Sequence, residues 1–303
     1  MDIQEFLRLV DDAAERRAHY ATMLPAFYDL ATSPYRANWG ESFHLPPFGP
    51  GESLAEAMRR QERELARAAG FGPGMQVLDV GCGIGGPALS IANASGAHVT
   101  GVNIVPMHID IARAKAAEQG LAHLTRFVVA DMVDMPFPDT FFDGAFSFDA
   151  ICHSPDKPAT YEGIARVLKP GAVFAGCDWL CADGMSADEY REWIEPICRY
   201  AALPAVLSLS EVAGQLRDAG FDVDMCQDLA EGGDMTPNWQ AFEDAAATIA
   251  APRDPEHEVL WQHATTTARG GRAGKFKIGH WLARKRREAQ PQSASTDHRM
   301  STV

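Results

Sequence analysis

The 303-residue sequence lacks several features that mark whole classes of protein. Its six cysteines form no Cys-x-x-Cys pair, so neither a zinc site nor a disulfide framework is expected. No apolar run reaches the roughly 18 residues that a membrane-spanning helix requires. The N-terminus has neither the basic start nor the apolar core of a secretory signal. We therefore expect a reduced, cytoplasmic protein without stable membrane insertion.

Basic residues are also scarce. The chain carries 27 Lys and Arg against 41 Asp and Glu, which gives a net charge of −14. Because a nucleic-acid-binding protein presents a basic face, no nucleic-acid partner is expected. The basic cluster at residues 284–287 is interpreted as the solvated end of a helix or strand, and a weak contact with an anionic membrane is the alternative. Pairing with a second copy through the N-terminal helix, as a homo-oligomer, stays open.

What the sequence does contain is a glycine-rich turn between an apolar run and a helical pattern. Residues 77–80 predict a buried parallel strand and residues 88–94 a helix, with Gly81, Gly83 and Gly86 between them. Glycines let the backbone turn tightly and approach a ligand closely, as in the first unit of a doubly wound nucleotide-binding sheet. A glycine turn that binds nothing is disfavoured, because three glycines cost conformational entropy.

Two positions beside this turn discriminate between cofactors. The carboxylate of Asp79 would repel the pyrophosphate of a dinucleotide but attract the ammonium and sulfonium groups of S-adenosylmethionine. At the end of the next strand, where nicotinamide enzymes usually carry Asp or Glu, stands Asn103. We therefore predict S-adenosylmethionine as the cofactor. The residues predicted to hold it here are Asp79, Gly81, Gly83, Asn103 and His108.

Polar residues also follow the third and fourth predicted strands. Asp131 can accept a hydrogen bond from an adenine amine while Met132 packs on the ring, because ligands of open parallel sheets bind at the carboxyl ends of strands. After the fourth strand, Phe148 is predicted to contact the cofactor, and Asp149 and His153 are predicted to accept protons beside the methyl group. The alternatives are an ordinary loop acid, a turn-capping Asp and a structural His.

Two other kinds of site are not expected. A Ser/His/Asp triad is rejected because no serine lies in a Gly-x-Ser-x-Gly elbow. A metal site is not predicted, because no second histidine lies near His153 in the sequence.

The order of elements predicts an α/β fold. Strand and helix patterns alternate between residues 76 and 179, as in a mostly parallel sheet, and a last strand at 275–283 is expected to be antiparallel. Helical stretches at 181–207 and 237–268 interrupt this rhythm and are interpreted as a cap and a further insertion. The expected parts are an N-terminal helical and aromatic arm (1–70), the cofactor-binding core (71–180), the cap insertion with the C-terminal part of the core (181–287) and a disordered tail (288–303).

Aromatic residues gather in the N-terminal arm. Residues 27–44 are aromatic and are followed by prolines, so they are not expected to form a regular element. They are interpreted as a lid of rings over an apolar substrate, and simple packing of the arm on the core is the alternative. The residues predicted to contact the substrate are Tyr28, Trp39, Phe43 and Tyr200.

These motifs resemble the sterol C24-methyltransferase family of class I methyltransferases. The matching segments are residues 27–32, 39–44, 77–87, 99–103, 131–139, 152–156 and 167–174. The resemblance implies a Rossmann-like sheet and transfer of a methyl group from S-adenosylmethionine to an alkene carbon of a lipophilic isoprenoid. Family members carry Glu where this chain has Asp149, and the resemblance fades after about residue 240.

Methyl transfer to an alkene, which the resemblance implies, requires specific features of the site, and the sequence can supply them. An alkene is a weak nucleophile, so the site must align it and exclude water. The carbocation that forms needs aromatic ring faces and then a base. A sterol-like compound and a prenylated natural product both remain candidate substrates. The alternatives are an O- or N-methyltransferase on a small natural product, with His153 as the base, and a catalytically silent binding protein.

Overall fold

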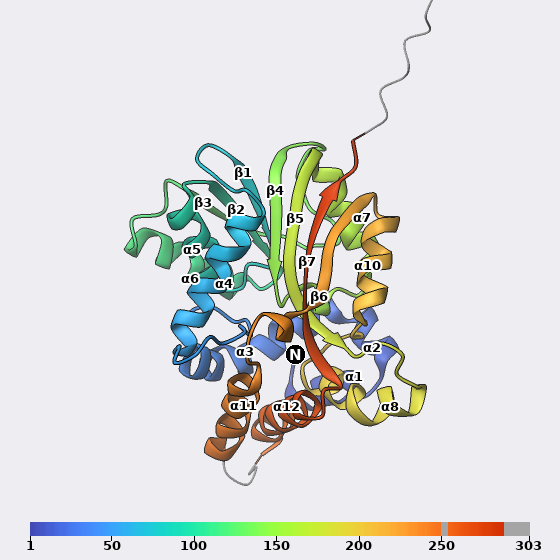
Figure 1. Cartoon of the computed structure of the whole chain (residues 1–303). Helices are drawn as coiled ribbons and strands as arrows, with labels where there is room; N and C mark the ends of the chain where they lie inside the picture. Colours follow the sequence, from blue (N-terminus) through green and yellow to red (C-terminus); the bar gives the residue numbers. More distant parts are fainter. Residues whose placement is uncertain (250–253, 288–303) are drawn as a thin grey trace, which may run out of the picture.

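Seven strands form one sheet in the computed structural model, which describes residues 1–249 and 254–287. Their order is β3-β2-β1-β4-β5-β7-β6 (Figure 1). The strands are β1 (Gln76–Val80), β2 (His98–Asn103), β3 (Thr125–Val129), β4 (Phe142–Phe148), β5 (Leu168–Cys181), β6 (Phe221–Asp228) and β7 (Phe276–Lys285). Strands β1 to β5 pair in parallel, and β7 runs antiparallel to both β5 and β6. The predicted α/β sheet with an antiparallel last strand is confirmed.

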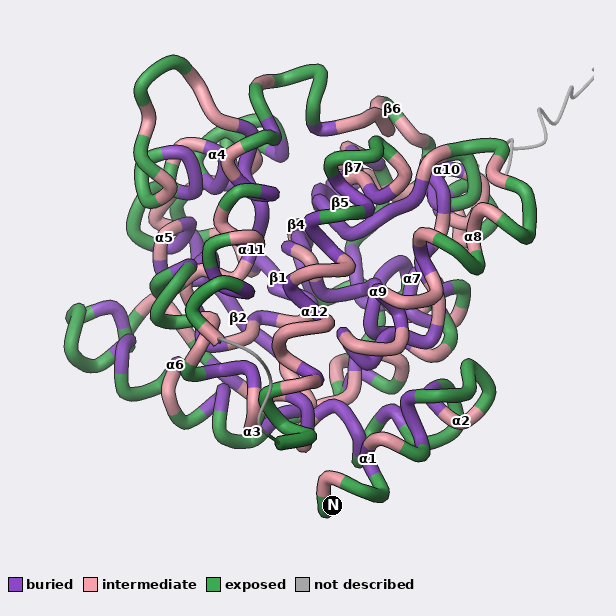
Figure 2. The backbone as a smooth tube through the Cα atoms, turned by 90° about the horizontal axis from the view of Figure 1, so that it is seen from below, coloured by how far each residue is buried: buried purple, intermediate pink, exposed green. Residues whose placement is uncertain are grey.

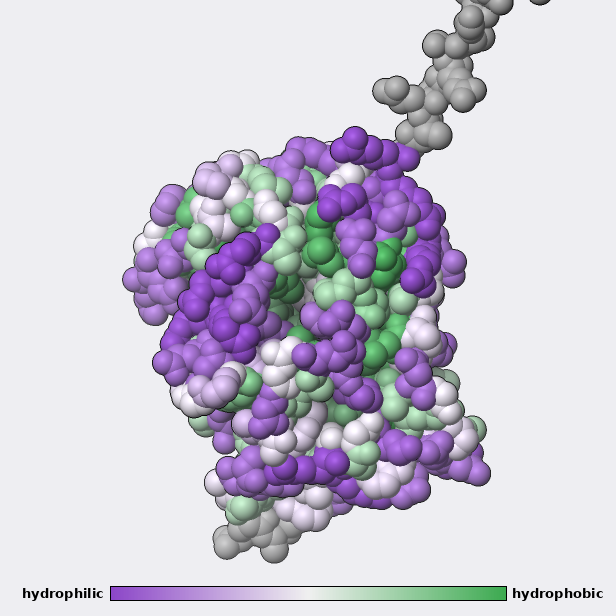
Figure 3. All heavy atoms as spheres, in the orientation of Figure 1, coloured by the Kyte–Doolittle hydropathy of each residue, from purple (hydrophilic) through white to green (hydrophobic). Residues whose placement is uncertain are grey.

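Side chains along each strand alternate between two faces, and different helices cover each face. Val77 packs in one cluster with residues of α4, α5 and α6, whereas Leu78 and Val80 pack in another with α7 and α10. These helices are α4 (Leu54–Ala68), α5 (Gly86–Ser95), α6 (Pro106–Glu118), α7 (Lys157–Val167) and α10 (Leu209–Asp218). The central strands β1, β4 and β5 are largely buried between the two layers (Figure 2). Hydrophilic residues cover the outer surfaces of α4 and α10 (Figure 3).

The N-terminal arm is more regular than the sequence suggested. It consists of α1 (Ile3–Val10), α2 (Ala13–Ala18) and α3 (Tyr20–Trp39), and α3 is continuous although it contains Pro25 and Pro34. The expectation of an irregular segment was therefore wrong up to residue 39. Proline removes backbone hydrogen bonds, but tertiary packing of a buried helix face can outweigh that loss. The buried residues of α3 include Tyr20, Met23, Leu24, Phe27 and Ala31, which recur at helical spacing.

The carboxyl ends of the parallel strands point toward a group of helices. This group contains α3, the cap helices α8 (Ala187–Trp193) and α9 (Glu195–Tyr200), and the pair α11 (Thr236–Ile249) and α12 (Pro255–Arg272) (Figure 1). Two short 3-10 helices, η1 (Ile151–His153) and η2 (Leu229–Gly232), follow β4 and β6. No helix in the described ranges is long and apolar enough to cross a membrane. The tail predicted at residues 288–303 lies outside the described residues.

Candidate functional site

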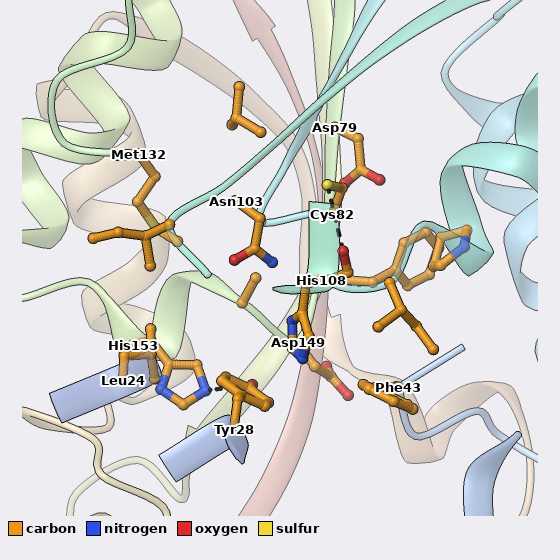
Figure 4. Close-up of a pocket in the computed structure, with 18 of the residues that line it drawn as sticks. Leu24, Tyr28, Phe43, Asp79, Cys82, Asn103, His108, Met132, Asp149 and His153 are labelled. Carbon is orange, nitrogen blue, oxygen red and sulfur yellow. Dashed lines mark hydrogen bonds between the residues drawn. The ribbon is translucent and has the colours of Figure 1, made fainter. Parts of the chain in front are cut away.

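A cleft opens between the carboxyl ends of β1, β2 and β4 and the helix α3 that crosses them (Figure 4). The space inside it, including the part that is open to solvent at its mouth, is about 740 Å³. Most of the residues predicted from the sequence meet here. The predicted residues that line the cleft are Tyr28, Phe43, Asp79, Gly81, Gly83, Asn103, His108, Met132, Phe148, Asp149 and His153.

The glycine turn after β1 forms one side of this cleft. The backbone N–H groups of Gly81 and Cys82 both donate to the carbonyl of Val102 on β2, which folds the turn back against the sheet. Gly81 has φ +83°, and a Cβ there would lie 2.3 Å from the Cβ of Ala150. Gly83 has φ +48°, and a Cβ on it would meet no atom of the described chain within 4 Å. Gly81 is therefore needed for packing, whereas Gly83 leaves space for a ligand.

Asp79 is the acid that precedes this turn. Its side chain is buried, and its Oδ2 has no hydrogen-bond partner among the described residues. Burial, together with the charge of Glu62, raises the pKa of Asp79 well above its usual range. A buried carboxylate without a partner is costly, and a cationic group in the cleft would relieve that cost. The cleft therefore fits S-adenosylmethionine better than a ligand that carries a pyrophosphate.

Asn103 and His108 lie beyond the glycine turn, at the end of β2 and in α6. Asn103 accepts from the N–H of Val105 at 2.9 Å through Oδ1, and its amide group points into the cleft (Figure 4). Nε2 of His108 lies 2.8 Å from the hydroxyl of Thr32, and burial lowers the pKa of His108 to about 4. The histidine is therefore neutral in the wall of the cleft.

Of the two neighbours Asp131 and Met132, the structure places only Met132 in the lining of the cleft. Met132 lines the cleft, as expected for a residue that packs on an adenine ring. Asp131 is not among the residues that line the cleft in the described chain, and its Oδ1 accepts from the N–H of Val133 at 2.9 Å. Burial and this nearby carboxylate raise the pKa of Tyr20 on α3. The adenine-binding role of Asp131 stays a prediction, because its turn-capping bond also accounts for the residue.

Asp149 follows β4 in a left-handed conformation, with φ +46°. Its Oδ2 accepts from the N–H of Leu45 at 3.0 Å, and its Oδ1 lies 3.7 Å from the thiol of Cys177. Burial raises the pKa of Asp149 to about 6, although the charge of His44 opposes the shift. Asp149 is therefore a carboxylate at neutral pH that can take up a proton at modest cost.

His153 lies across the cleft from Asp149 and contacts α3. The hydroxyl of Tyr28 lies 3.1 Å from its Nε2. Burial, with the charge of Lys157, lowers the pKa of His153 to about 3, while burial raises the pKa of Tyr28. The histidine is thus neutral and the phenol protonated, so the phenol donates to Nε2. Figure 4 shows this pair at the lower edge of the cleft.

A second cavity, which we call the aromatic pocket, continues from the cleft. It encloses about 240 Å³. Its lining residues are Tyr35, Trp39, Phe43, His44, Leu45, Asp149, Trp179 and Phe242. Phe43 and Asp149 line both cavities, so the Asp149 carboxylate stands where the two spaces meet. Five of its lining residues were not predicted from the sequence: Tyr35, His44, Leu45, Trp179 and Phe242.

Two predicted substrate residues lie away from the cleft. Trp39 lines the aromatic pocket instead, with its ring 4.6 Å from that of Phe242. Tyr200 lines neither cavity in the described part of the chain; it is half-buried at the end of α9, under the guanidinium of Arg199 at 5.1 Å. The buried face of this short helix is formed by Ile197 and Cys198, so Tyr200 points elsewhere. Within residues 1–249 and 254–287, no three His, Cys, Asp or Glu side chains are grouped as for a metal ion.

Comparisons with known proteins agree with this geometry. A family model described as a methyltransferase domain matches residues 78–176. The cycloartenol-C-24-methyltransferase of Arabidopsis thaliana is 41% identical over 219 residues, which cover 72% of this chain and 65% of that protein. The 24-methylenesterol C-methyltransferase 2 of the same plant is 34% identical over 88% of this chain and 79% of its own length. The chain spans 60–65% of the length of several fungal and plant relatives.

A solved structure shares the architecture. The crystal structure of the [4+2]-cyclase SpnF superposes with a TM-score of 0.75 and 25% identity, over 87% of this chain and 95% of that one. The predicted Rossmann-like methyltransferase fold is thereby confirmed. With identities above 30% over most of both chains, the protein belongs to the sterol methyltransferase family.

Proposed function

We propose that this protein is an S-adenosylmethionine-dependent C-methyltransferase that acts on an alkene carbon of a lipophilic isoprenoid. The observation that carries the proposal is the position of Asp149, which lines both the cofactor cleft and the aromatic pocket. A methyl donor on one side and an apolar acceptor on the other would meet beside this side chain.

The cleft residues would hold the cofactor by charge and by shape. Asp79 offers an unpaired buried carboxylate to the ammonium group, and Gly83 leaves room beside the backbone. Met132 offers a surface for the adenine ring. When bound, S-adenosylmethionine supplies an electrophilic methyl group on its sulfonium.

The aromatic pocket would align the alkene and keep water away from it. Its walls are mostly aromatic and apolar, so they match the alkenyl end of an isoprenoid better than a polar group. Ring faces of Tyr35, Trp39 and Trp179 would stabilise the positive charge that methylation leaves on the substrate.

Asp149 would then remove a proton from the carbon next to the cationic centre. The C–H bond breaks, its electron pair forms the new double bond, and the proton moves to the carboxylate. A pKa of about 6 leaves Asp149 ionised at neutral pH and therefore able to accept. His153, whose Nε2 is already engaged by Tyr28, would instead fix the orientation of that ring. Proton acceptance by His153 is the second candidate role.

Product analysis tests the proposal. The protein is incubated with trideuteromethyl-labelled S-adenosylmethionine and, separately, with isoprenoid alkenes, phenols and amines, and each product is analysed by mass spectrometry and NMR. We expect label on carbon in an isoprenoid product. Label on oxygen or nitrogen alone would instead indicate an O- or N-methyltransferase. Binding of S-adenosylhomocysteine without any methylated product would indicate a silent binding protein.

A further inference from the structure

On the basis of this function, we propose that Phe242 of α11 is the end wall of the aromatic pocket and determines the size of the alkenyl group that the pocket accepts. The ring of Phe242 is buried. It lies 4.6 Å from the ring of Trp39 and 6.4 Å from that of Trp179, between centroids. It therefore closes the space between two walls of the pocket.

Phe242 comes from a different part of the chain than the rest of the pocket. The other seven lining residues fall between positions 35 and 179, whereas Phe242 lies on the α11–α12 pair. The methyltransferase domain matches residues 78–176, which contain most of the cofactor cleft but, of the residues that line the pocket, only Asp149. The aromatic walls, Phe242 included, can therefore differ between family members that keep the same cofactor cleft.

Hydrogen bonds hold the α11–α12 pair against the segments that form the other walls of the aromatic pocket. Asn238 of α11 donates through Nδ2 to the carbonyl of Pro46 at 2.8 Å, and the bond is buried. The backbones of Phe48 and Asp234 exchange two hydrogen bonds, of 2.9 and 3.0 Å, just before α11.

Helix α12 also contacts two walls of the pocket, Tyr35 and Trp179. Nε2 of its His263 lies 2.7 Å from the hydroxyl of Tyr35 on α3, and the imidazole ring stacks on Trp179 at 5.9 Å. With the backbone of the pair fixed at these points, the side chain at position 242 decides how far the pocket extends.

The size of the ring gives the scale of the effect. The phenyl ring of Phe242, which is one wall of the pocket, occupies about the space of one isoprene unit. Removal of the ring extends the pocket by about that unit. The wild-type protein therefore prefers short alkenyl groups, and Phe242→Ala prefers longer ones.

A chain-length series measures this preference directly. Wild type, Phe242→Ala and the milder Phe242→Leu are assayed with prenyl, geranyl and farnesyl alcohols in the presence of S-adenosylmethionine, and kcat/KM is compared. Binding of the same alcohols is followed by tryptophan fluorescence in the presence of S-adenosylhomocysteine. Trp239→Phe is the matched control. Trp239 packs within the same helix pair, where a Cβ on Gly271 would lie 2.4 Å from its ring, but it is not among the residues that line the pocket in the described chain.

We expect the ratio of kcat/KM for the longer alcohol over the shorter one to rise about tenfold or more in Phe242→Ala, less in Phe242→Leu, and not in Trp239→Phe. The same ratio in every variant, or an equal rise in Trp239→Phe, would overturn the role of Phe242. If the wild type binds the alcohols but methylates none, the proposed function fails, and the ratio of binding constants still decides the role of Phe242. If the wild type binds none of them, both proposals fail.

Discussion

The hydroxyl of Tyr28 on α3 lies 3.1 Å from Nε2 of His153, which belongs to the short helix η1 after β4. Two further hydroxyls on the same face of α3 make equivalent contacts, because residues three and four apart are neighbours on a helix. These pairs are Thr32 with His108 at 2.8 Å and Tyr35 with His263 at 2.7 Å. Three separate elements, η1, α6 and α12, thus fix α3 over the cofactor cleft.

Replacement of Tyr28 by Phe tests the importance of this attachment. The buried imidazole of His153 loses the partner of its Nε2, so the free energy of unfolding should fall by about 1–2 kcal/mol. Turnover should fall about tenfold, because α3 is held less firmly over the reacting groups. Chemical denaturation and steady-state kinetics measure the two effects. Tyr200→Phe is the control, since Tyr200 lines neither described cavity, and an equal loss of turnover in that variant would contradict the assignment.

Asp79→Asn should separate ligand binding from folding. The variant keeps the shape of the side chain but loses its charge, so affinity for S-adenosylhomocysteine, which keeps the ammonium group, should fall about 10- to 100-fold. The stability of the free protein should not fall, because Asp79 is buried and its Oδ2 lacks a partner among the described residues. Calorimetry and denaturation test both points. Asp110→Asn makes the same charge change on the exposed side of α6 and should bind like wild type.

The glycine turn offers a paired comparison of alanine substitutions. In Gly83→Ala the new methyl group meets no described atom within 4 Å and enters the cleft, so affinity for S-adenosylhomocysteine should fall while strain costs only about 1–2 kcal/mol. In Gly81→Ala the methyl group would lie 2.3 Å from the Cβ of Ala150, so the turn must shift and stability should fall more. Equal stability of the two variants would contradict this distinction.

The sequence predicted those parts of the fold that depend on local pattern. The apolar run before Gly81 and the acid at Asp79 identified both the first strand and the chemistry of its ligand, because that signal lies within a few adjacent residues. The second half of α3 was missed, because aromatic residues followed by prolines argue against a regular element locally, and only the packing of α3 and its pairs with distant histidines outweigh that signal.

The aromatic pocket could not be predicted in full for a similar reason. Trp179 lies in strand β5 and Phe242 in helix α11, where a buried aromatic residue is unremarkable. Asp149 lies where the two cavities meet. Its position depends on the register between β4 and β5 and on the hydrogen bond that its side chain accepts from the N–H of Leu45. Such contacts join residues far apart in the chain and leave no periodic signal.

Asp178 on β5 should impose a pH dependence on stability. Its carboxyl is buried, and burial together with the charge of Asp149 raises its pKa from 3.8 to about 7. The folded state therefore binds more protons than the unfolded state between about pH 4 and 7, and this group makes the protein less stable as pH rises through that window.

Asp178→Asn removes this dependence. Relative to wild type, its free energy of unfolding should increase as pH is raised from about 4 to 7, by about 2–4 kcal/mol, and then stay level. Denaturation at a series of pH values measures the difference. Asp188→Asn, at a highly exposed position, serves as the control and should show a difference that does not change with pH. If the free energy of unfolding of Asp178→Asn differed from that of wild type by the same amount at every pH, the raised pKa of Asp178 would be contradicted.

The most direct measurement is the pH dependence of turnover in wild type and in Asp149→Asn, with affinity for S-adenosylhomocysteine measured alongside. Asparagine tolerates the left-handed backbone at this position, where φ is +46°. Because the ionised form of Asp149 must accept the proton, wild-type turnover should fall as pH drops below about 6. Asp149→Asn should lose turnover by about 10²- to 10⁴-fold and keep its affinity for the ligand. Wild-type turnover in Asp149→Asn, or a wild-type profile without a fall near pH 6, would contradict proton transfer to Asp149.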